Sequence, residues 1–129
     1  MYFDQAGEQN TKDALHIAVA EAQKGGIRHL VVASTRGHTG LQAATLLQGT
    51  GMGLVVVTHN TGFSEEGEQE FDQDKRTRIE ELGGTVYTGT MVLRNLGTAI
   101  RSAQSYSQQD LVANTLRMLG QGMKVCVEI

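Results

Sequence analysis

The sequence contains no proline and no tryptophan, and Cys126 is the only cysteine in its 129 residues. Without proline, the sharp turns and helix ends must come from the 16 glycines. A lone thiol cannot form an internal disulfide, so we expect a reducing compartment. Because Cys126 lies in an apolar stretch, we predict that it is an inert thiol of the core.

An excess of one charge and long apolar runs are also missing. The 11 basic and 14 acidic residues give a formal charge of −3, which argues against a nucleic acid as partner, because binding to the phosphate backbone needs a basic face. No apolar run is long enough to cross a bilayer, so we expect no membrane partner. The first residues, Met1–Asp4, lack the basic and apolar regions of a signal peptide, and we therefore expect a cytoplasmic protein.

Apolar runs alternate with amphipathic stretches, and the size fits one globular domain over residues 1–129. Strands are predicted at residues 27–33, 54–58, 85–88 and 123–129, because these runs are rich in β-branched residues or alternate. Helices are predicted at residues 10–24, 39–48, 72–82, 93–103 and 110–119. This alternation predicts an α/β fold with a mainly parallel sheet and helices on both of its faces.

Polar segments follow the first three predicted strands. Right-handed crossovers bring the carboxyl ends of parallel strands to one edge of the sheet, where open α/β sheets bind ligands. The candidate ligand-binding residues in these segments are Ser34, Thr35, Arg36, Gly37, His38 and Thr39, then Thr58, His59, Asn60, Thr61, Gly62 and Phe63, and finally Thr88, Gly89 and Thr90.

The first segment joins a strand to a helix, where backbone N–H groups are unpaired and the helix dipole is positive. Its hydroxyl groups can donate hydrogen bonds to an anion, its glycine lets the backbone approach, and Arg36 and His38 supply positive charge. We therefore predict a binding site for a phosphate or another anion. The alternative is a purely structural loop, in which serine and threonine cap the helix and glycine turns the chain.

The other two segments, residues 58–63 and 88–90, offer groups that could contact the part of the ligand other than its phosphate. His59 is expected beside the first loop if the first two strands are neighbours, and Phe63 offers a flat surface for a ring. The hydroxyls around Gly89 suit a sugar or a phosphate. Ordinary alternatives are a polar connection for the second segment and a turn with a helix cap for the third.

Other chemistry is weakly indicated. No third ligand accompanies His38 and His59, so we predict no metal site. The acidic cluster of Glu65, Glu66, Glu68 and Glu70 is interpreted as a solvated loop. No pairing of a nucleophile with a base can be read from the spacing.

Several stretches resemble the C-terminal domain of pyruvate kinase, and above all its stand-alone archaeal and bacterial relatives. They are Val32–Thr39 followed by a helix, Val55–Phe63, Thr88–Thr90 and Thr115–Ile129. The resemblance covers nearly the whole chain from Asn10, and the last stretch is the most specific. It implies a three-layer α/β/α domain with strand order 3-2-1-4, which continues past Ile129 into a helix and an antiparallel strand.

The resemblance also implies a ligand for the first loop. In some pyruvate kinases the corresponding loop binds the phosphate of an allosteric sugar bisphosphate, which would place a phosphate at residues 34–39. The family has serine or threonine where Arg36 stands and usually arginine where His38 stands. The positive charge is therefore shifted within the loop. The catalytic barrel of pyruvate kinase has no counterpart in these residues, so phosphoryl transfer from phosphoenolpyruvate is not expected.

The leading hypothesis is thus binding of a phosphorylated small molecule at the crevice where the strands end, without pyruvate kinase activity. The ligand would be a sugar phosphate or a mononucleotide such as FMN, with Phe63 and Tyr87 as surfaces for the flavin ring. One alternative is an enzyme acting on a phosphorylated metabolite, with His59 or His38 as acid and base. Another is a structural or regulatory module, including a homo-oligomer, that docks through the last strand.

Overall fold

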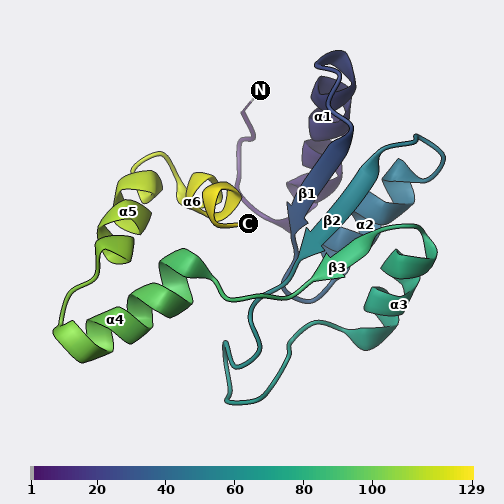
Figure 1. The fold of residues 1–129 in the computed structure, drawn as a ribbon. Helices are drawn as coiled ribbons and strands as arrows, with labels where there is room; N and C mark the ends of the chain where they lie inside the picture. The colour runs from purple at the N-terminus through teal and green to yellow at the C-terminus, as the bar shows by residue number, and fades with distance from the viewer. Residues whose placement is uncertain (1) are drawn as a thin grey trace.

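The computed structural model describes residues 2–129 and has a mixed α/β architecture (Figure 1). The strands are β1 (His29–Ala33), β2 (Gly53–Val57) and β3 (Thr85–Tyr87). The helices are α1 (Thr11–Lys24), α2 (His38–Leu47), α3 (Gln73–Glu81), α4 (Gly97–Gln104), α5 (Gln108–Arg117) and α6 (Gln121–Glu128). A 3-10 turn, η1 (Glu8–Asn10), precedes α1, and a π-helical turn, η2 (Val92–Leu96), precedes α4.

The three strands form a parallel sheet in the order β1-β2-β3. Ala33 is level with Val57, and Val57 is level with Tyr87. All three strands therefore end at the same edge of the sheet. The parallel sheet and the α/β class agree with the sequence-based expectation.

Helices α1, α2 and α3 pack on one face of the sheet and enclose the core. The buried apolar residues of this core are Leu15, Val19, Val32, Ala43, Ala44, Leu47, Leu54, Val56, Phe71 and Ile79. Gly40 lets α2 lie close to β2, because a Cβ added there would be 2.7 Å from Cγ1 of Val56. The loops that leave the strands are thus anchored to a tightly packed half of the molecule.

The opposite face of the sheet is not covered as expected. Val31 and Tyr87 are 47% and 58% exposed, although helices were predicted on both faces of the sheet. Helices α4, α5 and α6 lie to one side of the sheet instead of above it (Figure 1). The structure therefore has helices on one face of the sheet, where the sequence and the resemblance predict three layers.

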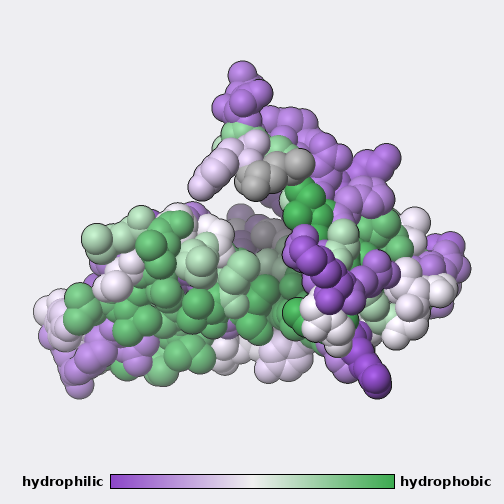
Figure 2. Space-filling view, turned by 90° about the horizontal axis from the view of Figure 1, so that it is seen from above, coloured by the Kyte–Doolittle hydropathy of each residue, from purple (hydrophilic) through white to green (hydrophobic). Residues whose placement is uncertain are grey.

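The helices α4, α5 and α6 and the turn η2, here called the helical lobe, pack mainly against one another. An ion pair between Lys124 and Glu128 is buried inside this lobe. The other carboxylate oxygen of Glu128 accepts the N–H of Arg94 at 2.9 Å, which ties α6 to η2. Figure 2 shows many hydrophobic residues on the surface of the lobe, and Leu119 and Val127 are among those exposed.

The last predicted strand is wrong, because residues 121–128 form α6. A strand at this position would need a neighbouring sheet edge, whereas a helix satisfies its own backbone groups, as in the 3.1 Å bond from the Ile129 N–H to the Val125 carbonyl. The Lys124–Glu128 pair, four residues apart, also favours a helix. Cys126 consequently lies on an exposed helix surface, not in the core.

Helix boundaries differ from the predictions by only a few residues. Helix α2 begins at His38 after Gly37, whose φ of 89° only glycine adopts easily, so Thr39 is not its cap. Asp72, the first residue of the predicted range 72–82, caps α3, since its carboxylate accepts the Lys75 N–H. Ser107 caps α5, which begins at Gln108, two residues earlier than expected. Among residues 2–129, no helix is long and apolar enough to span a membrane.

Candidate functional site

The three polar segments meet at the edge where the strands end. The N–H of Ser34 donates to the Val57 carbonyl at 2.9 Å, and the N–H of Thr58 donates to the Tyr87 carbonyl at the same distance. Ser34, Thr58 and Thr88 therefore follow the three strands in one row. Strands β1 and β2 are neighbours, which is the condition under which His59 was expected beside the first loop.

A cavity of about 350 Å³, here called the anion cavity, opens at the N-terminus of α2. It is lined by Ser34, Thr35, Arg36, His38 and Thr39, together with Glu8, Thr11, Gln42 and Glu70. Ser34 is buried and its hydroxyl oxygen accepts the Gly40 N–H at 3.2 Å, which fixes the loop against the helix. The arrangement joins a guanidinium, an imidazole, hydroxyls and the positive end of a helix.

Gly37 shapes this loop without lining the cavity. A Cβ at Gly37 would be 2.9 Å from Cβ of Lys75 and 3.2 Å from the Phe71 ring. Its role is therefore to let the loop pass close to α3 and to adopt a left-handed backbone. The expected close approach of backbone to ligand is replaced here by a close approach to the protein itself.

A second cavity of about 290 Å³, here called the crevice, lies between the strand ends and α6. It is lined by Ala33, Ser34, Thr35, Val57, Thr58, His59, Tyr87, Gly89, Thr90, Met91, Val125, Glu128 and Ile129. Ser34 and Thr35 line both the crevice and the anion cavity. The two hollows are therefore neighbours that share these residues as part of their walls.

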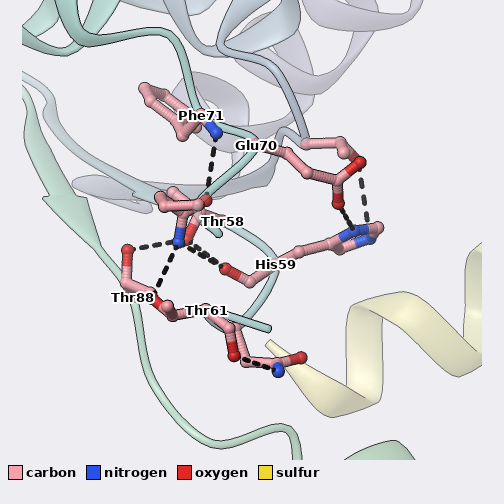
Figure 3. A network of polar contacts seen from close by, with 9 residues as sticks. Thr58, His59, Thr61, Glu70, Phe71 and Thr88 are labelled. Carbon is pink, nitrogen blue, oxygen red and sulfur yellow. Dashed lines mark hydrogen bonds and ion pairs between the residues drawn. The ribbon is translucent and has the colours of Figure 1, made fainter. Parts of the chain in front are cut away.

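A third hollow of about 360 Å³ is lined by Asn60, Thr61, Thr88, Gly89, Thr90 and Asn95. The Thr88 hydroxyl lies 2.7 Å from the Thr58 hydroxyl and accepts from the Arg76 guanidinium at 3.3 Å. The Thr58 hydroxyl donates to the His59 carbonyl. These two predicted ligand hydroxyls are thus used to hold the strand ends together (Figure 3).

His59 is held between a carboxylate and a hydroxyl. Its Nδ1 lies 3.1 Å from Oε2 of Glu70, and its Nε2 lies 3.4 Å from Oγ1 of Thr35. Figure 3 shows the imidazole ring facing the Glu70 carboxylate across the loop. The hydrogen bond with His59 is the main cause that lowers the pKa of Glu70; partial burial opposes it, and Ser64 and the charges of His59 and Arg36 lower the pKa further.

Phe63 is engaged within the protein. Its ring stacks on the His59 ring with centroids 3.8 Å apart, and the Arg94 guanidinium lies 4.2 Å from its centroid. Phe63 therefore steadies His59 instead of offering a free ring surface. Gly62, with a φ of 78°, turns the same loop, and its N–H donates to the Glu68 carbonyl. Neither residue lines the three hollows described above.

Sequence reasoning missed Glu70, which it assigned to a solvated acidic cluster. Glu70 follows His59 by eleven residues, a separation that carries no periodic signal. The only local hint is its position just before the buried Phe71 and the cap Asp72. Within residues 2–129, no group of three His, Cys, Asp or Glu side chains is arranged to hold a metal ion.

A larger open groove of about 760 Å³ runs between α1 and α2 beside the anion cavity. It shares Glu8, His38 and Gln42 with that cavity, and Leu15, Leu41 and Leu46 form part of its floor. No signal in the sequence pointed to this groove.

A comparison of the sequence with models of protein families finds no matching family.

Proposed function

We propose that this protein binds a phosphorylated small molecule, with the phosphate in the anion cavity and the rest of the ligand in the adjoining crevice. The observation that carries the proposal is that Ser34, Thr35, Arg36, His38 and Thr39 line one cavity at the start of α2. Charge-assisted hydrogen bonds contribute about 1.5–3 kcal/mol each. A few of them suffice for micromolar binding after the cost of association.

The carboxylates of the anion cavity do not oppose this assignment. Glu70 is engaged by His59, whose Nδ1 lies 3.1 Å from its Oε2, so this carboxylate is held by the protein. Glu8 lies on the exposed turn η1 at the rim. Arg36 is itself exposed, and its side chain can move toward a ligand at little cost.

The ligand class follows from the crevice and from the resemblance. Hydroxyls and a glycine, at Thr35, Gly89 and Thr90, suit a sugar phosphate. Tyr87 lines the crevice and offers an aromatic ring to a mononucleotide such as FMN. The resemblance to the pyruvate kinase C-terminal domain supports the same position for the phosphate, without pyruvate kinase activity, and we keep kinship with that family as part of the proposal.

Calorimetric titration with a hexose bisphosphate, a hexose monophosphate and FMN tests the proposal. We expect one of them to bind, its dephosphorylated counterpart (for FMN, riboflavin) to bind at least tenfold more weakly, and Arg36→Gln to weaken binding about tenfold, which corresponds to 1.4 kcal/mol. Arg78→Gln is the matched control, because this arginine lies on the exposed side of α3 and pairs with Glu81. Equal affinity of both variants, or no binding of any phosphorylated compound, would refute the proposal.

A further inference from the structure

We propose that the Thr35 hydroxyl accepts a phosphoryl group, with His59 as the base that removes its proton and Glu70 as the residue that orients His59. This inference rests on the proposed function, because the phosphoryl group of the donor has to bind in the same anion cavity. It adds a reaction, a nucleophile and a positioning residue to what is otherwise a binding site.

The first observation is the order of the three side chains. Oγ1 of Thr35 is 3.4 Å from Nε2 of His59, and Nδ1 of the same ring is 3.1 Å from Oε2 of Glu70. A hydroxyl, an imidazole and a carboxylate in this sequence form the arrangement that activates a hydroxyl nucleophile. The three residues come from two connecting segments: Thr35 follows β1, and His59 and Glu70 both lie in the loop between β2 and α3.

The second observation concerns the position of the imidazole proton. An ionised carboxylate only accepts hydrogen bonds, so Nδ1 of His59 must be the donor to Glu70. In the neutral form of the ring, Nε2 then carries the lone pair, and it is the nitrogen that lies 3.4 Å from Oγ1 of Thr35. The hydrogen bond from His59 lowers the pKa of Glu70, which keeps the carboxylate ionised and this tautomer in place.

The third observation is that the histidine is held and partly shielded. The side chains of His59 and Glu70 are 28% and 19% exposed. Phe63 stacks on the imidazole, and Arg94 covers Phe63. A fixed ring loses little conformational freedom when it accepts a proton, which is what a general base needs.

The fourth observation is the location of the hydroxyl. Thr35 lines the anion cavity and also the crevice, which His59 lines as well, so the proposed nucleophile belongs to a residue that adjoins both the phosphate position and the base. Arg36 and the N-terminus of α2 lie on the same cavity. They can stabilise the charge on the transferred group in the transition state.

The proposed step is balanced without a further reactant. The oxygen of Thr35 forms a bond to phosphorus, and the bond from phosphorus to the leaving oxygen breaks, with its electron pair going to the leaving group. Nε2 of His59 takes the hydroxyl proton. The donor class is an acyl phosphate or a phosphate monoester whose leaving group is stable as an anion.

Acetyl phosphate is a suitable probe, because its leaving group is acetate. We expect intact-mass spectrometry to show one added phosphoryl group and peptide mapping to place it on Thr35. Thr35→Ser should keep the modification and Thr35→Val should lose it. His59→Asn should slow it by about 10²-fold or more. Thr77→Val, on an exposed position of α3, is the control that should leave the rate unchanged.

The test of Glu70 must distinguish the positioning of His59 from a general effect of the substitution on the structure. In Glu70→Ala we expect nitrogen NMR to show His59 losing its preference for the proton on Nδ1, together with slower phosphorylation. Circular dichroism of each variant checks that the fold is retained. An unchanged tautomer together with an unchanged rate would remove Glu70 from the proposal.

The outcomes separate this inference from the proposed function. If inorganic phosphate and acetyl phosphate bind but Thr35 is never modified, the inference is overturned and the binding function stands. If neither these two compounds nor the sugar phosphates and FMN bind, both fail. An acid-labile modification on His59 or His38, in place of an acid-stable one on Thr35, also overturns it.

Discussion

Gly40 is a residue at which one missing atom decides how closely a helix approaches the sheet. A Cβ at this position would be 2.7 Å from Cγ1 of Val56 and 3.2 Å from Cδ1 of Ile79, and both side chains are fully buried. Gly40→Ala should therefore destabilise the protein by about 1–3 kcal/mol through overpacking. Urea unfolding followed by circular dichroism measures the change.

Gly122 provides the matched control for Gly40. It also lies in a helix, α6, but a Cβ there would meet nothing within 4 Å. Gly122→Ala should stabilise α6 by up to about 1 kcal/mol, the difference in helix propensity between the two residues. A loss of stability in Gly122→Ala, or none in Gly40→Ala, would contradict this account of the packing.

Residues of the candidate site could be predicted from the sequence where they directly follow a predicted strand. Thr35 and His59 follow adjacent strands, so their proximity follows from a parallel sheet. Glu70 could not be predicted, because its contact with His59 depends on the path of an irregular loop. Phe63 was identified as part of the site, but its stacking on His59 depends on side-chain packing that no periodicity encodes.

At the scale of elements, the start of α3 depends on one carboxylate. Asp72 accepts the Lys75 N–H at 3.0 Å and pairs with the Lys75 ammonium at 2.6 Å. These side-chain and backbone hydrogen bonds with Lys75 lower the pKa of Asp72, against a smaller opposing effect of desolvation. The carboxylate thus contributes stability that is complete above the ordinary aspartate pKa and is lost as the pH falls through the lowered value.

We therefore expect Asp72→Asn to be less stable than the wild type at pH 7, and the difference to shrink as the pH is lowered below about 4, the ordinary range for aspartate. Asparagine keeps a capping oxygen, so the comparison isolates the charge. Asp74→Asn removes a charge from the same turn without breaking the bond to Lys75, and it should have a smaller effect. If the difference in stability between the wild type and Asp72→Asn grows as the pH falls, the ionised carboxylate does not stabilise the protein.

Helices and strands were predicted correctly where the sequence pattern fits only one kind of element. They were predicted poorly where the spacing of apolar and charged residues fits both a strand and a helix. The β-branched runs that became β1 and β2 are too short for helices and are bounded by glycine or polar turns. Residues 123–129 alternate like a strand, yet Lys124 and Glu128 are also spaced for a helical ion pair. The helix satisfies the backbone groups of this segment internally, as in the bond from the Ile129 N–H to the Val125 carbonyl, and needs no sheet edge.

At the scale of the whole molecule, the sheet with α1–α3 should have a higher free energy of local unfolding than the helical lobe. The buried apolar core belongs to β1–β3 and α1–α3, whereas the helical lobe buries few large apolar side chains among residues 2–129. Element pairs that pack extensively fall within one group or the other. The composition indicated one domain but not this division, because the same helical patterns fit a helix above the sheet and a helix beside it.

Hydrogen exchange followed by mass spectrometry tests this division. Amides of β2 should exchange slowest and those of α5 and α6 fastest, since local opening requires less buried surface to be exposed in the lobe. Ile79→Ala, which truncates a fully buried side chain, should cost about 2–5 kcal/mol and accelerate exchange in β1–β3 while leaving α5 and α6 unchanged. If Ile79→Ala accelerates exchange equally in all elements, the chain unfolds as one unit. The crevice between the sheet and α6 then opens only when the core unfolds.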